Sequence, residues 1–236
     1  MTKQKAFSIP FYRQSYDFTC GPACMIMAMK AFDPAIKPAR ELEIDLWREA
    51  NLIEAYATSH HGLAMAAHRR GFRAMTWGNA KADRLLDCMC RSCKIQMDST
   101  QKTIECGLVA RPVEILDHRL CLLLNQENRV FALALLKDLR NRCRRAKIHN
   151  HERPITPSTI RGWLDNGWIP IILVDARLVG DEEVPHWVVV TGCSRMTMTF
   201  HDPLARHGNS SIATRKFNEL LGFHGTESAV VIMGKS

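Results

Sequence analysis

A cysteine stands directly before Gly-Pro in the stretch QSYDFTCGPACMIMAMK, residues 14–30. The apolar residues after it predict a buried helix from Cys20 to Phe32, because Pro22 suits the first turn of a helix, where its missing N–H would be unpaired anyway. A thiol at a helix N-terminus lies at the positive end of the helix dipole, which favours the nucleophilic thiolate. Cys20 is therefore a candidate nucleophile, although a structural cysteine would also suit an apolar helix.

A second stretch, PHWVVVTGCSRMTMTFHDP, predicts a β-hairpin whose turn is centred on Ser194. In this register His186 lies opposite Asp202, and directly opposite side chains point to the same side of a sheet. The same register pairs Val188 with Phe200 on an apolar face. A carboxylate beside the imidazole can accept its N–H, fix its tautomer and stabilise its charged form. The pair suits a catalytic base and the residue that orients it, and an incidental cross-strand pair is the alternative.

Gln14 lies six residues before Cys20. A side-chain amide just upstream of a nucleophile can donate a hydrogen bond to a developing oxyanion, alongside the backbone N–H of Cys20. An ordinary surface glutamine is the simpler explanation. If the chemistry holds, His186 takes the Cys20 proton, the thiolate attacks a carbonyl carbon, and a thioester acyl-enzyme forms. Release by water would make the chain a hydrolase, and release by an amine would make it an acyltransferase.

The elements that must position these residues predict an α+β fold, because helices lead and strands follow, as in proteins with an antiparallel sheet. The expected helices cover residues 20–32, 39–55, 59–70, 130–146, 158–167 and 214–221, with Ser158 as the N-cap of the fifth. The expected strands cover residues 72–77, 168–174, 185–192, 196–203 and 228–233.

The chain has 236 residues and 46% hydrophobic residues, which suits one domain with a substantial core. No apolar run approaches the roughly 18 residues that cross a bilayer, and no apolar run follows Lys3 and Lys5 as in a secretory signal. We therefore expect a cytoplasmic protein that does not bind membranes. The formal charge is +8, and basic residues cluster over residues 137–153. No aromatic residue is interleaved for base stacking, so a solvated helix face is favoured over nucleic-acid binding.

Nine cysteines, in a reducing compartment, indicate free thiols, metal ligands or a nucleophile rather than disulfides. Cys88, Cys90, Cys93 and Cys106 could supply the four sulfur ligands of a structural zinc ion. No second Cys-x-x-Cys motif follows Cys90 and Cys93, so incidental thiols are favoured. We expect no metal and no cofactor, and a zinc-binding interaction module remains the alternative function.

Together, QSYDFTCGPAC at residues 14–24, PHWVVVTG at residues 185–192 and HDP at residues 201–203 resemble a papain-like cysteine peptidase. The closest resemblance is to the family that cleaves double-glycine leader peptides from bacteriocin precursors, and to its stand-alone soluble bacterial relatives. The resemblance implies a papain-like fold, with N-terminal helices, a buried central helix and a C-terminal antiparallel sheet. It also implies residue roles: nucleophile for Cys20, general base and acid for His186, orienting acid for Asp202 and oxyanion donor for Gln14.

The resemblance covers about the first 80 residues and the chain from about Ser158 onward. Residues 81–155 match nothing in the family, so we expect a single domain over residues 1–236 with a possible insertion there. The implied substrate is a peptide or protein, and some soluble relatives are associated with acetyltransferase or peptide-ligase partners. A papain-like protein that binds peptides without cutting them is a further alternative.

Overall fold

The computed structural model of the chain describes residues 8–51, 58–79, 93–97, 102–106, 126–180, 184–223 and 226–235. Its helices are α1 (Cys20–Phe32), α2 (Arg40–Ala50), α3 (His60–Arg69), α6 (Gln126–Arg145), α7 (Pro157–Asp165) and α8 (Thr214–Glu219), with one short 3-10 helix at Ala176–Leu178. Its strands are β1 (Phe72–Gly78), β2 (Cys93–Met97), β3 (Lys102–Cys106), β4 (His149–Glu152), β5 (Ile169–Asp175), β6 (Pro185–Cys193), β7 (Thr197–His201), β8 (Ser210–Ala213) and β9 (Ser228–Lys235).

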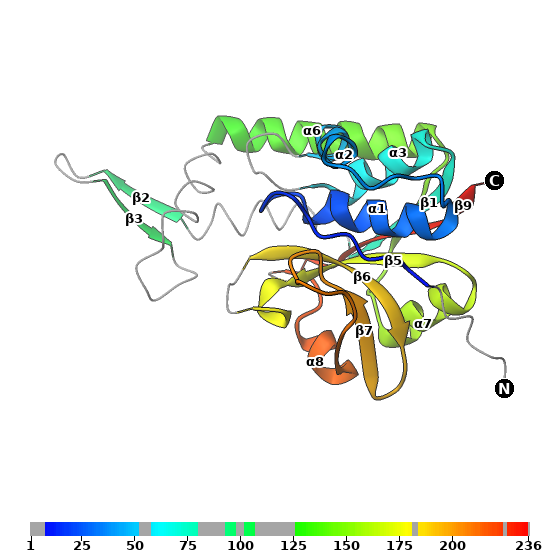
Figure 1. Cartoon of the computed structure of the whole chain (residues 1–236). Coiled ribbons are helices and arrows are strands. Elements are labelled where there is room, and N and C mark those ends of the chain that lie inside the picture. Colours follow the sequence, from blue (N-terminus) through cyan, green and yellow to red (C-terminus); the bar gives the residue numbers. More distant parts are fainter. Residues whose placement is uncertain are drawn as a thin grey trace.

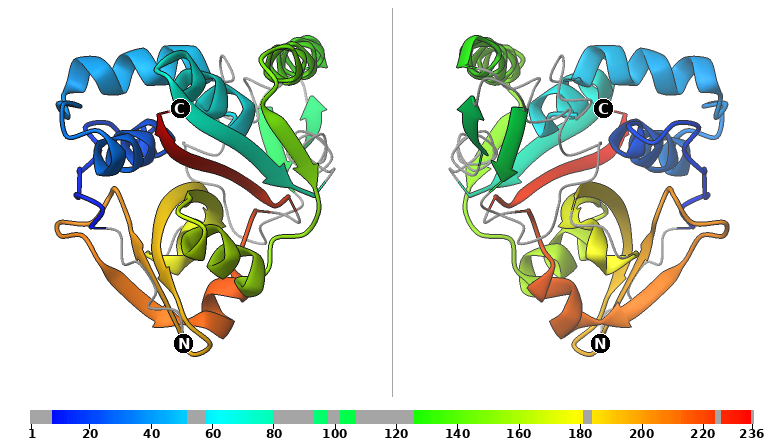
Figure 2. Two further views of the ribbon diagram at one scale, coloured as in Figure 1. Left: turned by 90° about the vertical axis from the view of Figure 1, so that its right-hand side faces the viewer. Right: turned by 90° about the vertical axis from the view of Figure 1, so that its left-hand side faces the viewer.

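The expected α+β class is confirmed. Seven strands form one sheet in the order β4-β1-β9-β5-β6-β7-β8, and every neighbouring pair is antiparallel except β1 with β4. Helices α1, α2, α3 and α6 lie on one side of this sheet, and α7 and α8 lie on the other (Figure 1). Views from the two sides show the same layers, with the twisted sheet passing between them (Figure 2).

Strand β5 has a continuous apolar run because helices cover both of its faces. All seven of its residues are buried. Ile169, Ile171 and Leu173 join the core beneath α1, whereas Ile172 and Val174 join the core beneath α7. This alternation follows the two-residue period of a strand. The sheet therefore divides the protein into two hydrophobic cores, and the candidate nucleophile is carried by the helix of the first core.

Helix α1 begins and ends where the sequence predicted, at Cys20 and Phe32. The run from Gly21 to Met29 is buried throughout, as expected for a helix that is apolar on nearly all sides. It packs against β5, β6 and β9 on one side and against α2 and α3 on the other. A helix wrapped in this way holds its N-terminus, and thus Cys20, at a fixed place beside the sheet.

Three sequence predictions of boundaries or strands need correction. Helix α2 ends at Ala50 rather than at Ala55, because Asn51 is extended and forms an isolated β-bridge with Thr58. The N-cap of α7 is Thr156 rather than Ser158, since the Thr156 hydroxyl accepts the N–H of Thr159 at 3.2 Å. Strands β2, β3, β4 and β8 were not expected, and β4 and β8 are short and polar strands that pair with β1 and β7.

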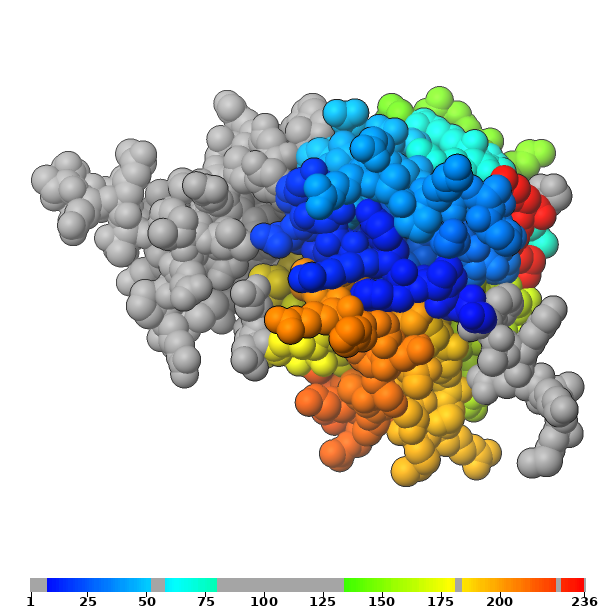
Figure 3. Space-filling view, viewed as in Figure 1, coloured from blue at the N-terminus to red at the C-terminus, as the bar shows by residue number. Residues whose placement is uncertain are grey.

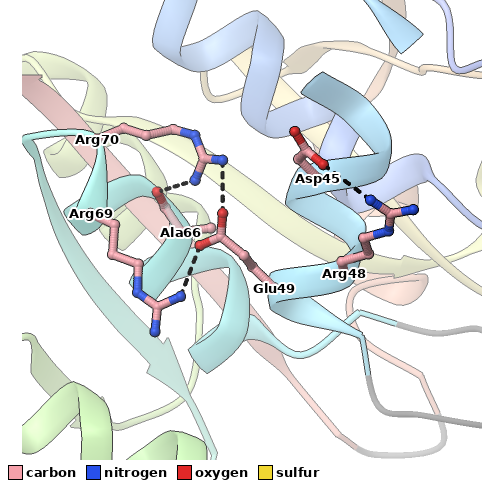
Figure 4. A network of polar contacts seen from close by, with 6 residues as sticks. All are labelled: Asp45, Arg48, Glu49, Ala66, Arg69 and Arg70. Carbon is pink, nitrogen blue, oxygen red and sulfur yellow. Dashed lines mark hydrogen bonds and ion pairs between the residues drawn. The ribbon is translucent and has the colours of Figure 1, made fainter. Parts of the chain in front are cut away.

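The contact between α2 and α3 includes a small ionic network at the end of each helix (Figure 4). Glu49 pairs with Arg69 at 3.1 Å and with Arg70 at 2.7 Å. The Arg70 guanidinium also donates to the carbonyl of Ala66 at 2.9 Å. A network of this kind fixes α2 on α3 more firmly than an isolated surface ion pair would.

Two helical glycines predict opposite effects on stability. A Cβ atom at Gly62 in α3 would lie 2.5 Å from the Cα atom of Ala50, whereas a Cβ atom at Gly162 in α7 would meet nothing within 4 Å. We expect Gly62→Ala to lower the free energy of unfolding by about 1–3 kcal/mol through overpacking. Gly162→Ala should raise it by about 0.5–1 kcal/mol, because alanine is the better helix former. Urea denaturation measures both, and equal effects of the two changes would contradict the close helix contact.

Among the described residues, no helix combines the length and the apolar character that crossing a bilayer requires.

Candidate active site

The hairpin of β6 and β7 has a register different from the predicted one. Val190, not Val188, lies opposite Phe200, and the register shifts again between Val190 and Gly192. The prediction that His186 lies directly opposite Asp202 is therefore wrong by two residues. The turn is centred between Arg195 and Met196 rather than on Ser194, since Cys193 pairs with Met198, which displaces the register by three residues, and the irregularity in β6 takes one of them back. A displacement by an even number keeps each side chain on its face, and the apolar residues of both strands still share one core. These residues are Val188, Val190, Met198 and Phe200.

His186 and Asp202 nevertheless form the expected pair. Both side chains are buried, and His186 Nε2 lies 2.8 Å from Asp202 Oδ1. The carboxylate can only accept, so Nε2 carries the hydrogen. The same Oδ1 atom accepts the backbone N–H of Leu204 at 2.9 Å. Two donors thus fix the carboxylate, and the imidazole is left with Nδ1 for another partner.

Cys20, the first residue of α1, has a partly exposed side chain and lies close enough to His186 to raise its pKa. Burial by itself lowers the pKa of His186, but the hydrogen bonds with Asp202 and Cys20 and the charges of both raise it to about 9. At neutral pH the imidazole is therefore protonated, as an imidazolium between a thiol group and a carboxylate. This is the arrangement that activates a cysteine nucleophile.

Cys24 shows how much the position within the helix matters. It lies one turn after Cys20 but is fully buried, and its Sγ atom donates to the carbonyl of Trp187 at 3.2 Å. Burial is the main cause that raises the pKa of the Cys24 thiol well above its usual value, and the charges of the nearby Cys20 and Asp202 add to it. Cys24 is a structural thiol in the core, so the same helix carries one thiol within reach of substrate and one that is withdrawn from it.

Gln14 is not the surface residue of the simpler explanation, because its side chain is only 9% exposed. Its Nε2 atom donates to the carbonyl of Tyr16 at 2.7 Å, and its backbone N–H donates to the carbonyl of Pro203 at 2.9 Å. Pro203 directly follows Asp202, so this bond joins the segment before Cys20 to the segment that carries the acid. The two segments lie against each other on one face of the molecule, blue and orange in Figure 3.

A cavity of about 410 Å³ borders this arrangement. Its lining consists of Arg13, Gln14, Ser15, Tyr16, Asp17, Arg40 and Leu204. Gln14 and Leu204 connect it directly with the residues described above. Cys20, His186 and Asp202 do not line this cavity, which lies on the side of Gln14 and Leu204.

The proposed zinc ligands are placed only in part. Cys88 and Cys90 lie outside the described residues, and Cys93 lies opposite Cys106 in the hairpin of β2 and β3. In the part of the chain that the structure describes, no group of three or more His, Cys, Asp or Glu residues could hold a metal ion. The zinc site therefore stays a prediction that no described contact supports.

Sequence reasoning missed Glu43 in α2, a carboxylate that is 0% exposed. It accepts hydrogen bonds from the segment between Tyr12 and Thr19, which contains Gln14. A signal for it exists, since Glu43 follows the same spacing as Leu46 and Ala50 on the apolar face of α2. A charged residue on such a face is buried only when polar partners meet it.

Residues 9–120 and 110–218 match a family model described as the Peptidase_C39 like family. The chain belongs to the Peptidase_C39 like family. The match confirms the family resemblance found in the sequence. The matched segments together also cover residues 81–155, and the expected single domain with a possible insertion there stays a prediction. The two matched segments overlap within this region, where the sequence had offered no motif.

A search of solved structures found a similar chain, the peptidase domain of Streptococcus ComA, a bi-functional ABC transporter involved in a quorum-sensing pathway. It is 12% identical, the TM-score is 0.45, and the alignment covers 96% of this C39-like chain and 99% of that domain. No curated protein is similar enough to this chain to count as a relative.

Proposed function

We propose that this C39-like chain is a papain-like cysteine peptidase that cleaves a peptide bond through a thioester acyl-enzyme. The observation that carries the proposal is the buried pair of His186 and Asp202, 2.8 Å apart, whose imidazole lies within electrostatic reach of Cys20 at the N-terminus of α1. Membership of a peptidase-like family supports the same reading. Gln14 is the proposed oxyanion donor. It is buried, it precedes Cys20 by six residues, and its backbone is bound to Pro203 after Asp202.

In the proposed reaction, His186 holds the proton of Cys20, and the thiolate attacks the carbonyl carbon of the scissile bond. The carbonyl oxygen becomes an oxyanion, which accepts the N–H of Cys20 and the second N–H of the Gln14 amide. The oxyanion collapses, the C–N bond breaks, and the imidazolium gives its proton to the leaving amine. His186 then takes a proton from water, and the resulting hydroxide cleaves the thioester. Asp202 keeps the imidazole in one tautomer throughout.

The proposed substrate is a peptide whose chain passes the cavity beside Gln14, and the resemblance points to cleavage after a double glycine. The test uses a mixture of peptides with and without internal Gly-Gly, incubated with the wild-type chain and with Cys20→Ala. New termini that depend on Cys20, mapped by mass spectrometry, support a peptidase. Transfer of the acyl group to an added amine without hydrolysis identifies an acyltransferase instead. Binding of peptides without any acylation of Cys20 identifies a silent binding protein.

Gln14→Ala should lower the rate of acylation of Cys20 by about 100- to 1000-fold, the usual cost of losing one oxyanion donor. Alkylation of Cys20 by iodoacetamide should stay within about twofold, because displacement at a saturated carbon forms no oxyanion. Acylation by p-nitrophenyl acetate, followed at Cys20 by mass spectrometry, provides the comparison without requiring the natural substrate. An equal loss in the rates of acylation and alkylation would contradict the role of Gln14 as an oxyanion donor.

The soluble relatives' association with acetyltransferase or peptide-ligase partners stays a prediction for this chain. Its cytoplasmic location likewise remains an expectation from the sequence.

A further inference from the structure

Glu43 places a carboxylate inside the protein at the back of the segment that carries Gln14. Its Oε1 atom accepts the backbone N–H of Ser15 at 2.9 Å and the hydroxyl of Thr19, and its Oε2 atom accepts the hydroxyl of Tyr12 at 2.9 Å. No basic residue in the described part of the chain forms an ion pair with it. A buried carboxylate without a cation is costly unless several donors meet it. Here those donors lie on both sides of Gln14.

Three donor groups lie within hydrogen-bonding distance of the carbonyl oxygen of Tyr16, and Glu43 affects which of them donate to it. That oxygen accepts Gln14 Nε2 at 2.7 Å and the N–H of Thr19 at 3.2 Å, which occupies both of its lone pairs. The Thr19 hydroxyl also lies within hydrogen-bonding distance, 2.8 Å from the same carbonyl. The Thr19 hydroxyl has only one hydrogen to donate, and the carboxylate of Glu43 is a stronger acceptor for it than the Tyr16 carbonyl. Glu43 therefore draws that hydrogen away and leaves the Tyr16 carbonyl to Gln14.

The bond to Tyr16 in turn fixes which way the Gln14 amide points. A reversed amide would place two acceptor oxygens against each other, so the NH2 group must face the Tyr16 carbonyl. One N–H is used there, and the second N–H remains for an oxyanion at Cys20. The ionic network between Glu49 and the arginines of α3 holds the helix from which Glu43 projects (Figure 4).

We propose that Glu43 is a positioning residue of the oxyanion site, which acts through Thr19 and Tyr16 to orient the amide of Gln14. This inference rests on the proposed function of Gln14 and Cys20. It assigns the larger part of the role to the place of the carboxylate oxygens and a smaller part to their charge. Shortening the side chain must then harm the site more than neutralising it at the same length.

The test compares Glu43→Asp, which keeps the charge but withdraws the oxygens, with Glu43→Gln, which keeps an oxygen in place but removes the charge. Each is measured alone and combined with Gln14→Ala. The readout is the rate of Cys20 acylation by p-nitrophenyl acetate divided by the rate of Cys20 alkylation by iodoacetamide, both resolved by mass spectrometry. We expect this ratio to fall about tenfold in Glu43→Asp and about threefold in Glu43→Gln, less than the full loss of an oxyanion donor.

In the Gln14→Ala background, Glu43→Asp should lower the ratio no further, because two residues that act through one group are not additive. The proposal is overturned by an unchanged ratio in Glu43→Asp, by a larger loss in Glu43→Gln than in Glu43→Asp, or by additive losses with Gln14→Ala. Failure of the proposed function gives a different result, since alkylation of Cys20 would then not depend on His186. Circular dichroism of each variant checks that the fold is kept.

Discussion

His186→Ala should lower the rate at which iodoacetamide alkylates Cys20 at pH 6.5 by about 100-fold. An ordinary thiol has a pKa of about 8.5, so only about 1% of it is thiolate at that pH. In the wild-type protein the positive charge of His186 lies within reach of Cys20, and a neighbouring cation of this kind activates a cysteine nucleophile. Peptide cleavage should fall further, by about 10⁴- to 10⁶-fold, because the same residue also protonates the leaving amine.

The pH dependence of this effect follows from the charge of His186. Its pKa is raised to about 9, so the imidazolium is present below that pH and is lost as pH rises through it. The advantage of wild type over His186→Ala should therefore be largest near pH 6 and disappear above about pH 9. Alkylation measured from pH 5 to 10, with Cys24 in the same samples as the buried control thiol, tests this directly. Equal rates for Cys20 in both proteins at pH 6.5 would refute the catalytic pair.

Asp202→Ala should lower the rate of Cys20 acylation by about 10⁴-fold, as expected when the residue that orients a catalytic histidine is lost. Without the carboxylate, the pKa of His186 should fall from about 9, because burial then dominates over the remaining hydrogen bond. The imidazole becomes neutral near pH 7 and free to adopt the wrong tautomer. Stopped-flow acylation and the pH profile of alkylation measure the two consequences separately.

Asp202→Asn is the matched control, and we expect a smaller loss than in Asp202→Ala, because an asparagine can also orient the catalytic histidine, as in Cys-His-Asn triads. The backbone N–H of Leu204 donates to the same Oδ1 atom that meets His186. This N–H needs an acceptor, so the amide oxygen of an asparagine must stay toward His186 and preserve the tautomer. Equal losses in both variants would show that charge, rather than orientation, is the main contribution of Asp202.

The candidate site could be predicted from the sequence because each of its residues carries a local signal. The apolar pattern after Cys20 and the Gly-Pro step identify the helix, and their cause is local backbone and packing preference. His186 and Asp202 follow from one hairpin. The residues directly opposite them across the hairpin could not be predicted, because strand alternation specifies which face a side chain occupies but not how far one strand is displaced along the other. The position of the turn, together with the irregularity in β6, decided that distance.

The chain alone thus determined the α+β class, the bounds of α1 and the residue types that could act together. Only the tertiary structure decided that Gln14 is buried, that Glu43 lies behind it, and that β4 and β8 are strands. These features depend on partners far away in the chain, such as Pro203 for Gln14 and the segment before Cys20 for Glu43. Local propensity contains no term for such partners, because a polar side chain is stabilised inside a protein only by the groups that the fold brings to it.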